Sequence, residues 1–164
     1  MGGVVVPMKL HGLFIRGLML PGSDPRVFEP LAKSLPLSGY TLLEWNHDDH
    51  TIPFQPFQPL LIVGHSLGGE RAYQISQSLG AVILCLLDPV RRSWSLSPFI
   101  KPDNVDLAIC FNRDRPHGFE LPPCVGFSDP KLNNYLNIPH SAFPTDPTVH
   151  VWLNEACKQM EAVA

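Results

Sequence analysis

The residues best suited to carry out a chemical reaction are 64–68, whose sequence is Gly-His-Ser-Leu-Gly. Apolar residues 60–63 lead directly into this run, and a segment compatible with a helix follows it. A serine at a sharp turn from strand to helix projects clear of the backbone, and flanking glycines leave room for such a turn. The helix that begins there directs free N–H groups toward any atom bonded to the serine oxygen. Ser66 is therefore the candidate nucleophile.

A serine hydroxyl is a weak nucleophile unless a base takes its proton, and an acid must hold that base in place. The carboxyl ends of the strands in an open parallel sheet meet at one edge, so these partners are expected directly after later strands. His140 lies between a strand-like run at 135–138 and the last expected helix. We therefore expect His140 to be the base, and His117 and His150 remain alternatives.

Two aspartates are candidates for the acid. Asp88 closes the apolar run 81–87, and Asp114 follows the next strand-like run at 105–111. An aspartate that ends an uninterrupted apolar strand is held at the sheet edge. Asp114 stands between two arginines, which could instead hold it in a surface ion pair. We expect Asp88 to be the acid, with Asp114 as the alternative.

Alternating apolar strands and amphipathic helices predict an α/β fold. The expected strands are 9–15, 40–45, 60–63, 81–87 and 105–111. Helices are expected from Asp24-Pro25 or from Pro30, from the serine turn to Gly80, and from Asp146-Pro147 onward. The prediction is a three-layer sandwich with a mostly parallel sheet of about five strands. Residues 1–164 are expected to form one domain.

Composition limits the possible classes of partner. A net charge of −3 gives no reason to expect nucleic acid or an anionic membrane surface. No apolar stretch approaches the length of a transmembrane span, and no secretory signal is visible, so a cytoplasmic protein is expected. The prolines between the apolar runs predict stiff loops, with hairpin-like material before residue 135.

Metal binding is not expected. The four cysteines lack metal-site spacing. Cys85 and Cys110 lie in apolar runs and are expected to be buried, whereas Cys124 and Cys157 could pair, although a reduced chain is the simpler interpretation. The cluster Asn46-His47-Asp48-Asp49-His50 carries ligand-type side chains. Its position between a strand end and a proline-rich segment favours a solvated loop.

Residues 64–69, Gly-His-Ser-Leu-Gly-Gly, resemble the nucleophile elbow of the α/β-hydrolase superfamily. The likeness extends in pieces over most of the chain. Within the superfamily the chain resembles the small lipase-like and cutinase-like serine esterases, and in size and layout those of bacteriophages and prophages. The predicted fold is therefore a minimal α/β-hydrolase.

The resemblance also implies roles for residues around the serine. The superfamily's chain order of Ser, Asp or Glu, then His excludes the histidines before the elbow and gives His65 a packing role. An oxyanion hole would consist of the N–H groups of Leu67 and Leu18. Leu18 follows Gly17 in the loop after the first strand, although Arg16 stands where many relatives have histidine.

The activity that the resemblance implies is cleavage of carboxylic esters through Ser66, His140 and Asp88, without a metal or an organic cofactor. The segments 90–103 and 113–131 are too short for a large helical lid, so small-molecule esters with short or medium acyl groups are expected. Aromatic residues in these segments could line an acyl pocket or pack under the loops: Trp94, Phe99, Phe119 and Phe127. The alternatives are a thioesterase or other acyl hydrolase with the same triad, or an inactive scaffold that only binds.

Overall fold

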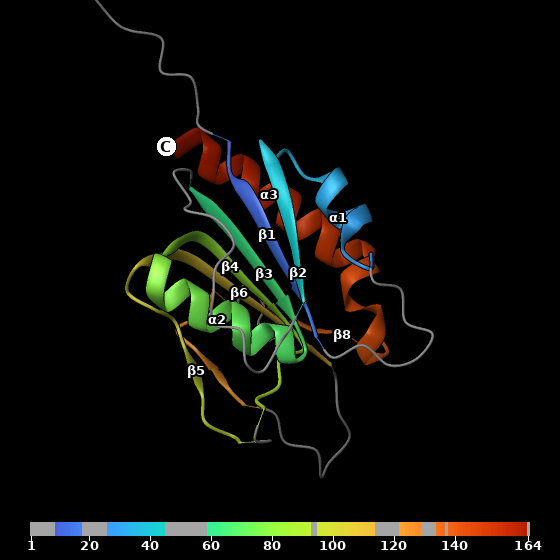
Figure 1. Ribbon diagram of the computed structural model, residues 1–164, viewed down its shortest axis with the longest axis vertical. Helices are drawn as coiled ribbons and strands as arrows, with labels where there is room; N and C mark the ends of the chain where they lie inside the picture. Colours follow the sequence, from blue (N-terminus) through green and yellow to red (C-terminus); the bar gives the residue numbers. More distant parts are fainter. Residues whose placement is uncertain are drawn as a thin grey trace, which may run out of the picture.

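The computed structural model describes residues 9–17, 26–44, 59–92, 95–113, 122–128, 134–136 and 138–163. Its centre is a sheet of six parallel strands in the order β2-β1-β3-β4-β6-β8 (Figure 1). The strands are β1 His11–Arg16, β2 Gly39–Glu44, β3 Leu60–His65, β4 Ala81–Leu87, β6 Val105–Arg113 and β8 Asn134–Leu136. The predicted α/β fold with a mostly parallel sheet is confirmed. One strand more than expected is present, because the short β8 pairs with the end of β6.

The order of the strands reverses between β1 and β3. From β1 the chain passes to β2 on one side, returns to β3 on the other side of β1, and continues outward to β4, β6 and β8. In doubly wound sheets, ligands bind at the carboxyl ends of the strands beside this reversal. Gly17 follows β1 and Ser66 follows β3, so both residues lie at this point.

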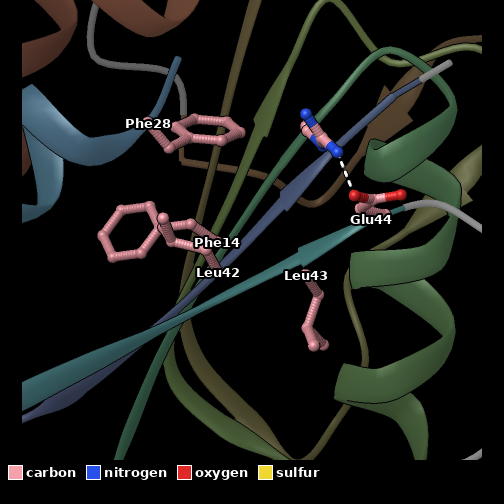
Figure 2. A pocket seen from close by; sticks show the side chains of 6 residues that line it. Phe14, Phe28, Leu42, Leu43 and Glu44 are labelled. Atoms are coloured by element: carbon pink, nitrogen blue, oxygen red, sulfur yellow. Dashed lines mark hydrogen bonds and ion pairs between the residues drawn. The ribbon is translucent and has the colours of Figure 1, made fainter. Parts of the chain in front are cut away.

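Helices cover both faces of the sheet. The helix α2, Leu67–Leu79, lies on one face, and α1, Glu29–Ser34, and α3, Pro147–Val163, lie on the other (Figure 1). On the α1 side, the rings of Phe14 and Phe28 meet with their centroids 5.6 Å apart (Figure 2).

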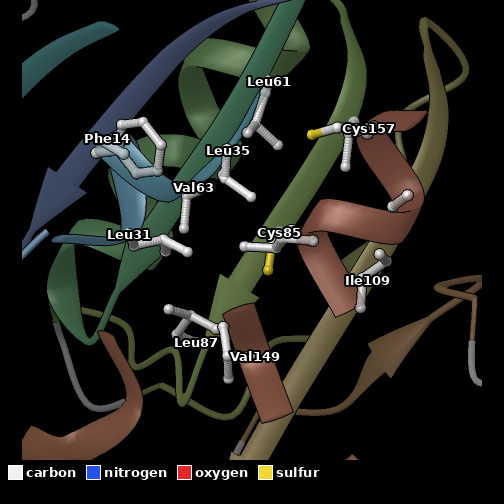
Figure 3. Packing of buried hydrophobic residues seen from close by; sticks show 14 of the residues in the cluster. Phe14, Leu31, Leu35, Leu61, Val63, Cys85, Leu87, Ile109, Val149 and Cys157 are labelled. Carbon is white, nitrogen blue, oxygen red and sulfur yellow. The ribbon is translucent and has the colours of Figure 1, made fainter. Parts of the chain in front are cut away.

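The two faces of the sheet carry separate apolar cores. The core on the α1 and α3 face includes Val63 of β3 and Val149 of α3 (Figure 3). The core on the α2 face includes Ile62 and Ile75. Because β3 and β4 are buried on both faces, their sequences are nearly continuous apolar runs.

Local signals set the end of α2 and the start of α3, as predicted. Gly80 has a φ of 73°, which glycine adopts readily, and its N–H donates a hydrogen bond to the carbonyl of Ser76 at 2.8 Å. At the start of α3, Oδ1 of Asp146 accepts a hydrogen bond from the N–H of Thr148 at 2.9 Å, and Pro147 is the first helical residue.

The first helix starts later than its Asp24-Pro25 signal suggests. Those two residues lie outside the described ranges, but residues 26–28 form a turn and α1 begins at Glu29. Pro30 lies in the first turn, where its missing N–H removes no helical hydrogen bond, so the alternative start is confirmed. No helix in the described ranges is long and apolar enough to cross a bilayer.

The cysteines are all free, and three of them, Cys85, Cys110 and Cys157, are buried as small apolar residues. Cys124 belongs to β7, Cys124–Val125, which pairs in parallel with β5, Phe99–Ile100. The described residues 122–128 therefore show a parallel pairing where hairpin-like material was expected, and residues 114–121 and 129–133 of that stretch lie outside the described ranges. The Cys124 thiol lies 2.7 Å from the sulfur of Cys110, whereas Cys157 belongs to the core on the opposite face. A pair between Cys124 and Cys157 is thus excluded by the sheet that separates them.

Candidate active site

Ser66 occupies a strained turn between β3 and α2. Its φ of 58° and ψ of −125° are unfavourable for a residue with a side chain. Three backbone hydrogen bonds hold the turn: the Ser66 N–H donates to the carbonyl of Leu87 at 3.1 Å, and the Ser66 carbonyl accepts from Gly69 at 3.0 Å and from Val90 at 3.1 Å. The surrounding structure therefore imposes a conformation that an isolated serine would avoid.

Glycines on both sides of Ser66 allow this turn to pack closely. A Cβ atom on Gly64 would lie 2.3 Å from the carbonyl oxygen of Gly68. A Cβ atom on Gly68 would lie 2.3 Å from the carbonyl oxygen of Ile15 in β1. Both separations are far below van der Waals contact, so only glycine fits at either position.

The exit from β1 passes directly beside the serine. A Cβ atom on Gly17 would lie 2.9 Å from Cβ of Ser66 and 3.3 Å from the backbone nitrogen of Leu67. Leu67 is the first residue of α2, where backbone N–H groups have no partner within the helix. This N–H group can serve a bound oxyanion. Leu18, the other expected donor, lies outside the described residues.

The structure brings the expected acid and base together. Asp88 directly follows β4 and is fully buried, and its N–H donates a hydrogen bond to the carbonyl of Phe111 at 2.6 Å. Its Oδ2 atom lies 2.5 Å from Nδ1 of His140, the first residue of a 3-10 helix, η1, His140–Thr145. The alternative acid, Asp114, lies outside the described residues.

The contact with Asp88 orients the His140 ring. A carboxylate accepts a hydrogen bond, so Nδ1 carries the proton and Nε2 is left with its lone pair. This is the tautomer that a general base at Nε2 requires. Among the described residues, no hydrogen bond joins the Ser66 hydroxyl to the His140 ring. In enzymes without bound substrate, such catalytic contacts are often long.

His65 fixes the position of His140 relative to the elbow. Its Nε2 atom lies 2.6 Å from the carbonyl oxygen of His140, and the centroids of the two rings are 4.6 Å apart. The ring of Phe143 stacks on the His65 ring, and their centroids are 6.5 Å apart. The packing role predicted for His65 missed this hydrogen bond, because nothing in the sequence relates residue 65 to residue 140.

The remaining described histidines lie in other environments. His11 contacts the hydroxyl of Thr41 at 3.0 Å, and burial lowers its pKa. His150 contacts the carbonyl of Pro144 at 3.0 Å. His117 and the cluster at 46–50 lie outside the described residues. Within the described ranges, no group of three or more His, Cys, Asp or Glu side chains could hold a metal ion.

Two of the four aromatic residues suggested for an acyl pocket lie in the described part of the chain. Phe99 is fully buried, and the guanidinium of Arg91 lies 4.2 Å from its ring centroid. Phe127 packs against the core on the α2 face. Both therefore have packing roles, whereas Trp94 and Phe119 lie outside the described residues.

Comparison with known proteins gives no assignment. No protein-family model matches the chain, no curated protein matches it, and no solved structure matches it. A functional conclusion must therefore rest on the chain's own residues.

Proposed function

We propose that this protein is a serine hydrolase that cleaves carboxylic esters by acyl transfer. The observation that supports this most strongly is the 2.5 Å contact between Asp88 Oδ2 and His140 Nδ1 beside a serine held in a strained turn. Strained backbone concentrates at functional sites, where the surrounding structure maintains it. A turn with no chemical role could relax or carry a different residue.

In the proposed reaction, Ser66 Oγ attacks the ester carbonyl while its proton passes to Nε2 of His140. The carbonyl oxygen becomes an oxyanion, which the N–H groups of Leu67 and Leu18 would stabilise. His140 then gives the proton to the leaving alcohol as the bond to the acyl carbon breaks. A water molecule, deprotonated by His140, releases the acid and restores Ser66.

The burial of Asp88 supports its role in this scheme. The imidazolium that forms on His140 carries a positive charge, and a carboxylate shielded from water stabilises that charge more strongly than an exposed one. Asp88 is fully buried, whereas the His140 side chain is 32% exposed and so remains accessible from solvent. The same arrangement can cleave thioesters, because the serine attacks the acyl carbon whether an alcohol or a thiol leaves. The proposed activity is therefore acyl transfer to water from either kind of ester.

The proposal is tested by the intact mass of the protein after treatment with a fluorophosphonate. We expect one adduct on the wild type and none on Ser66→Ala. Ser78→Ala, on an exposed position of the same helix, is the matched control and should be labelled like the wild type. Nitrophenyl esters and acyl thioesters then separate the two substrate classes. A folded wild-type protein that gains no adduct would contradict the proposal and favour a scaffold that only binds.

A further inference from the structure

Two of the four cysteines lie close enough to bond to each other. The thiol of Cys124 donates a hydrogen bond to Sγ of Cys110, and the two sulfur atoms are 2.7 Å apart. Carbon atoms, which are smaller than sulfur, prefer a non-bonded separation of about 3.5–4.0 Å. A disulfide bond joins sulfur atoms about 2.05 Å apart. Both thiols are free, so a small movement of the side chains is enough to bring them to bonding distance.

The two thiols differ in their access to solvent. Cys110 in β6 is buried, whereas Cys124 in β7 is half-buried. Burial, together with the hydrogen bond from Cys124, raises the pKa of Cys110 well above its ordinary value, so this thiol stays protonated near neutral pH. A dissolved oxidant therefore reacts first with Cys124, because accessible thiols are oxidised before buried ones. Cys110 is already in place to bond to the oxidised sulfur.

Short contacts attach the segment 122–128, which contains Cys124, to the rest of the fold. Its strand β7 has two residues and pairs with β5, which also has two (Figure 1). Two backbone hydrogen bonds, of 2.8 and 2.9 Å, join the segment to β5 and to the residue after it. The N–H of Ser128 donates to the carbonyl of Ala108 in β6 at 2.6 Å. Such a segment opens locally more easily than a central strand does.

A bond between these two cysteines would join parts of the chain that lead to the proposed acid and base. Cys110 precedes Phe111, whose carbonyl accepts a hydrogen bond from the N–H of Asp88. The segment 122–128 leads along the chain to β8, and His140 follows β8. A disulfide at this place would therefore fasten the segment before β8 to the strand that holds Asp88.

We propose that Cys110 and Cys124 form a reversible disulfide, with a peroxide as the oxidant and a dithiol as the reductant, that fastens residues 122–128 to β6. This modification site is separate from the proposed ester hydrolysis and does not depend on it. Cys85 and Cys157 lie in the core on the other face of the sheet, so they take no part (Figure 3).

The oxidation has two steps. The sulfur of Cys124 attacks one oxygen of hydrogen peroxide, the O–O bond breaks, and the displaced hydroxide leaves as water with the thiol proton. Cys124 is then a sulfenic acid. The sulfur of Cys110 attacks the sulfur of Cys124, so that the S–S bond forms while the S–O bond breaks, and hydroxide leaves as water with the Cys110 proton. One peroxide thus converts two thiols into one disulfide and two waters, and a dithiol restores both thiols by exchange.

The first test treats the reduced full chain with one equivalent of hydrogen peroxide, unfolds it in mildly acidic urea and counts free thiols by mass after alkylation. We expect four alkyl groups on the reduced protein, two on the oxidised protein and four again after dithiothreitol. Trypsin cleaves after Arg113 and so separates Cys110 from Cys124, whose peptides should be found linked. Cys157→Ala is the matched control and should form the same linked peptides.

The variant Cys110→Ala removes the second thiol and gives an independent readout. Without a neighbouring thiol, Cys124 should stop at the sulfenic acid. Dimedone, which traps sulfenic acids, should then label Cys124 several-fold more in this variant than in the wild type. Equal labelling in the two proteins would overturn the role assigned to Cys110.

Hydrogen exchange at the N–H of Ser128 reports on the fastening itself. This N–H leaves the carbonyl of Ala108 when residues 122–128 open locally, and a disulfide opposes that opening. Exchange should therefore be several-fold slower in the oxidised wild type than in the reduced one. The N–H of Ala32, which is bonded to the carbonyl of Phe28, exchanges when the short helix α1 opens and should not change.

The inference is overturned if the oxidised wild type keeps four reactive thiols or if the linked peptides are those of Cys85 and Cys157. It is also overturned if Cys124 proceeds to the sulfinic acid, which a dithiol does not reduce. An unchanged exchange rate at Ser128 would overturn the fastening. The thiol count uses the wild type, so it requires no variant to fold. None of these measurements involves Ser66, so a failed fluorophosphonate labelling would reject the hydrolase and leave the disulfide standing.

Discussion

At the residue scale, His140 is held from two sides. The buried carboxylate of Asp88 contacts Nδ1, while His65 contacts the backbone carbonyl of the same residue and packs against its ring. The first contact selects the tautomer, and the second ties the histidine to the strand that ends at Ser66. An imidazole constrained in this way needs little reorganisation to accept a proton.

We predict that Asp88→Asn lowers kcat by about three to four orders of magnitude. The amide would donate to Nδ1 where the carboxylate accepts, so the proton would move to Nε2 and block general-base catalysis. Steady-state hydrolysis of a nitrophenyl ester measures the effect. Asp146→Asn is the control, because asparagine caps a helix as well as aspartate does. A loss below tenfold would show that Asp88 is not the acid and would redirect attention to Asp114.

At the scale of elements, the close contact between β1, β3 and α2 builds the serine turn. The carbonyl groups of Ile15 and Arg16 lie against Gly68, and Gly69 lies against Pro89 after β4. The helix can approach the sheet this closely because its first turn has no side chains at these two positions. The position of the Leu67 N–H at the start of this helix therefore depends on glycine at positions 68 and 69.

We predict that Gly68→Ala destabilises the fold by about 2–3 kcal/mol, as overpacking of a rigid site does. The added methyl would lie 2.3 Å from the carbonyl oxygen of Ile15. This oxygen belongs to the backbone of β1, so it cannot rotate away from the methyl as a flexible side chain could. Urea unfolding measures the change. Gly39→Ala is the matched control, because its Cβ would lie 3.5 Å from His11 in ordinary contact. Similar losses in both variants would contradict this account.

At the scale of the whole molecule, two apolar cores hold the sheet between its helices, and both contain buried thiols. Cys85 and Cys157 lie in the core on the α3 face, and Cys110 lies in the core on the α2 face. Burial raises the pKa of Cys157 to about 12, and it also raises the pKa values of Cys85 and Cys110 well above that of an ordinary thiol. Folding therefore keeps these thiols protonated under conditions where an unfolded chain would ionise them.

We predict that stability falls as the pH rises above about 8.5, the ordinary pKa of a thiol in an unfolded chain. In the unfolded state the thiols release protons, whereas the folded state retains them until pH reaches the raised pKa. Each buried thiol then contributes a slope of up to about 1.4 kcal/mol per pH unit. Urea unfolding between pH 7.5 and pH 10 gives this slope.

Cys157→Ala separates the thiol's contribution from other titrating groups. It should reduce the slope of stability against pH, in addition to lowering stability through the cavity it creates. Val149→Ala is the control, because it removes a buried side chain of the same helix that does not titrate. If both variants keep the wild-type slope, ionisation of this thiol does not couple to unfolding.

The sequence by itself determined what short-range patterns encode. The apolar runs predicted the central strands, Gly80 and Asp146 predicted helix ends, and the glycines around Ser66 predicted a sharp turn between strand and helix. These features depend on backbone conformation and on periodicity within a few residues. The triad chemistry stays a prediction, because a pattern of residue types does not show reactivity.

Only the tertiary structure decided which distant side chains meet. Asp88 and His140 are separated by 52 positions. They come together because β4 and β8 end at the same edge of the sheet and each residue comes after one of these strands. The contact of His65 with His140 depends on the same strand order. Local patterns carry no information about strand order, since it follows from how the two apolar cores are buried together.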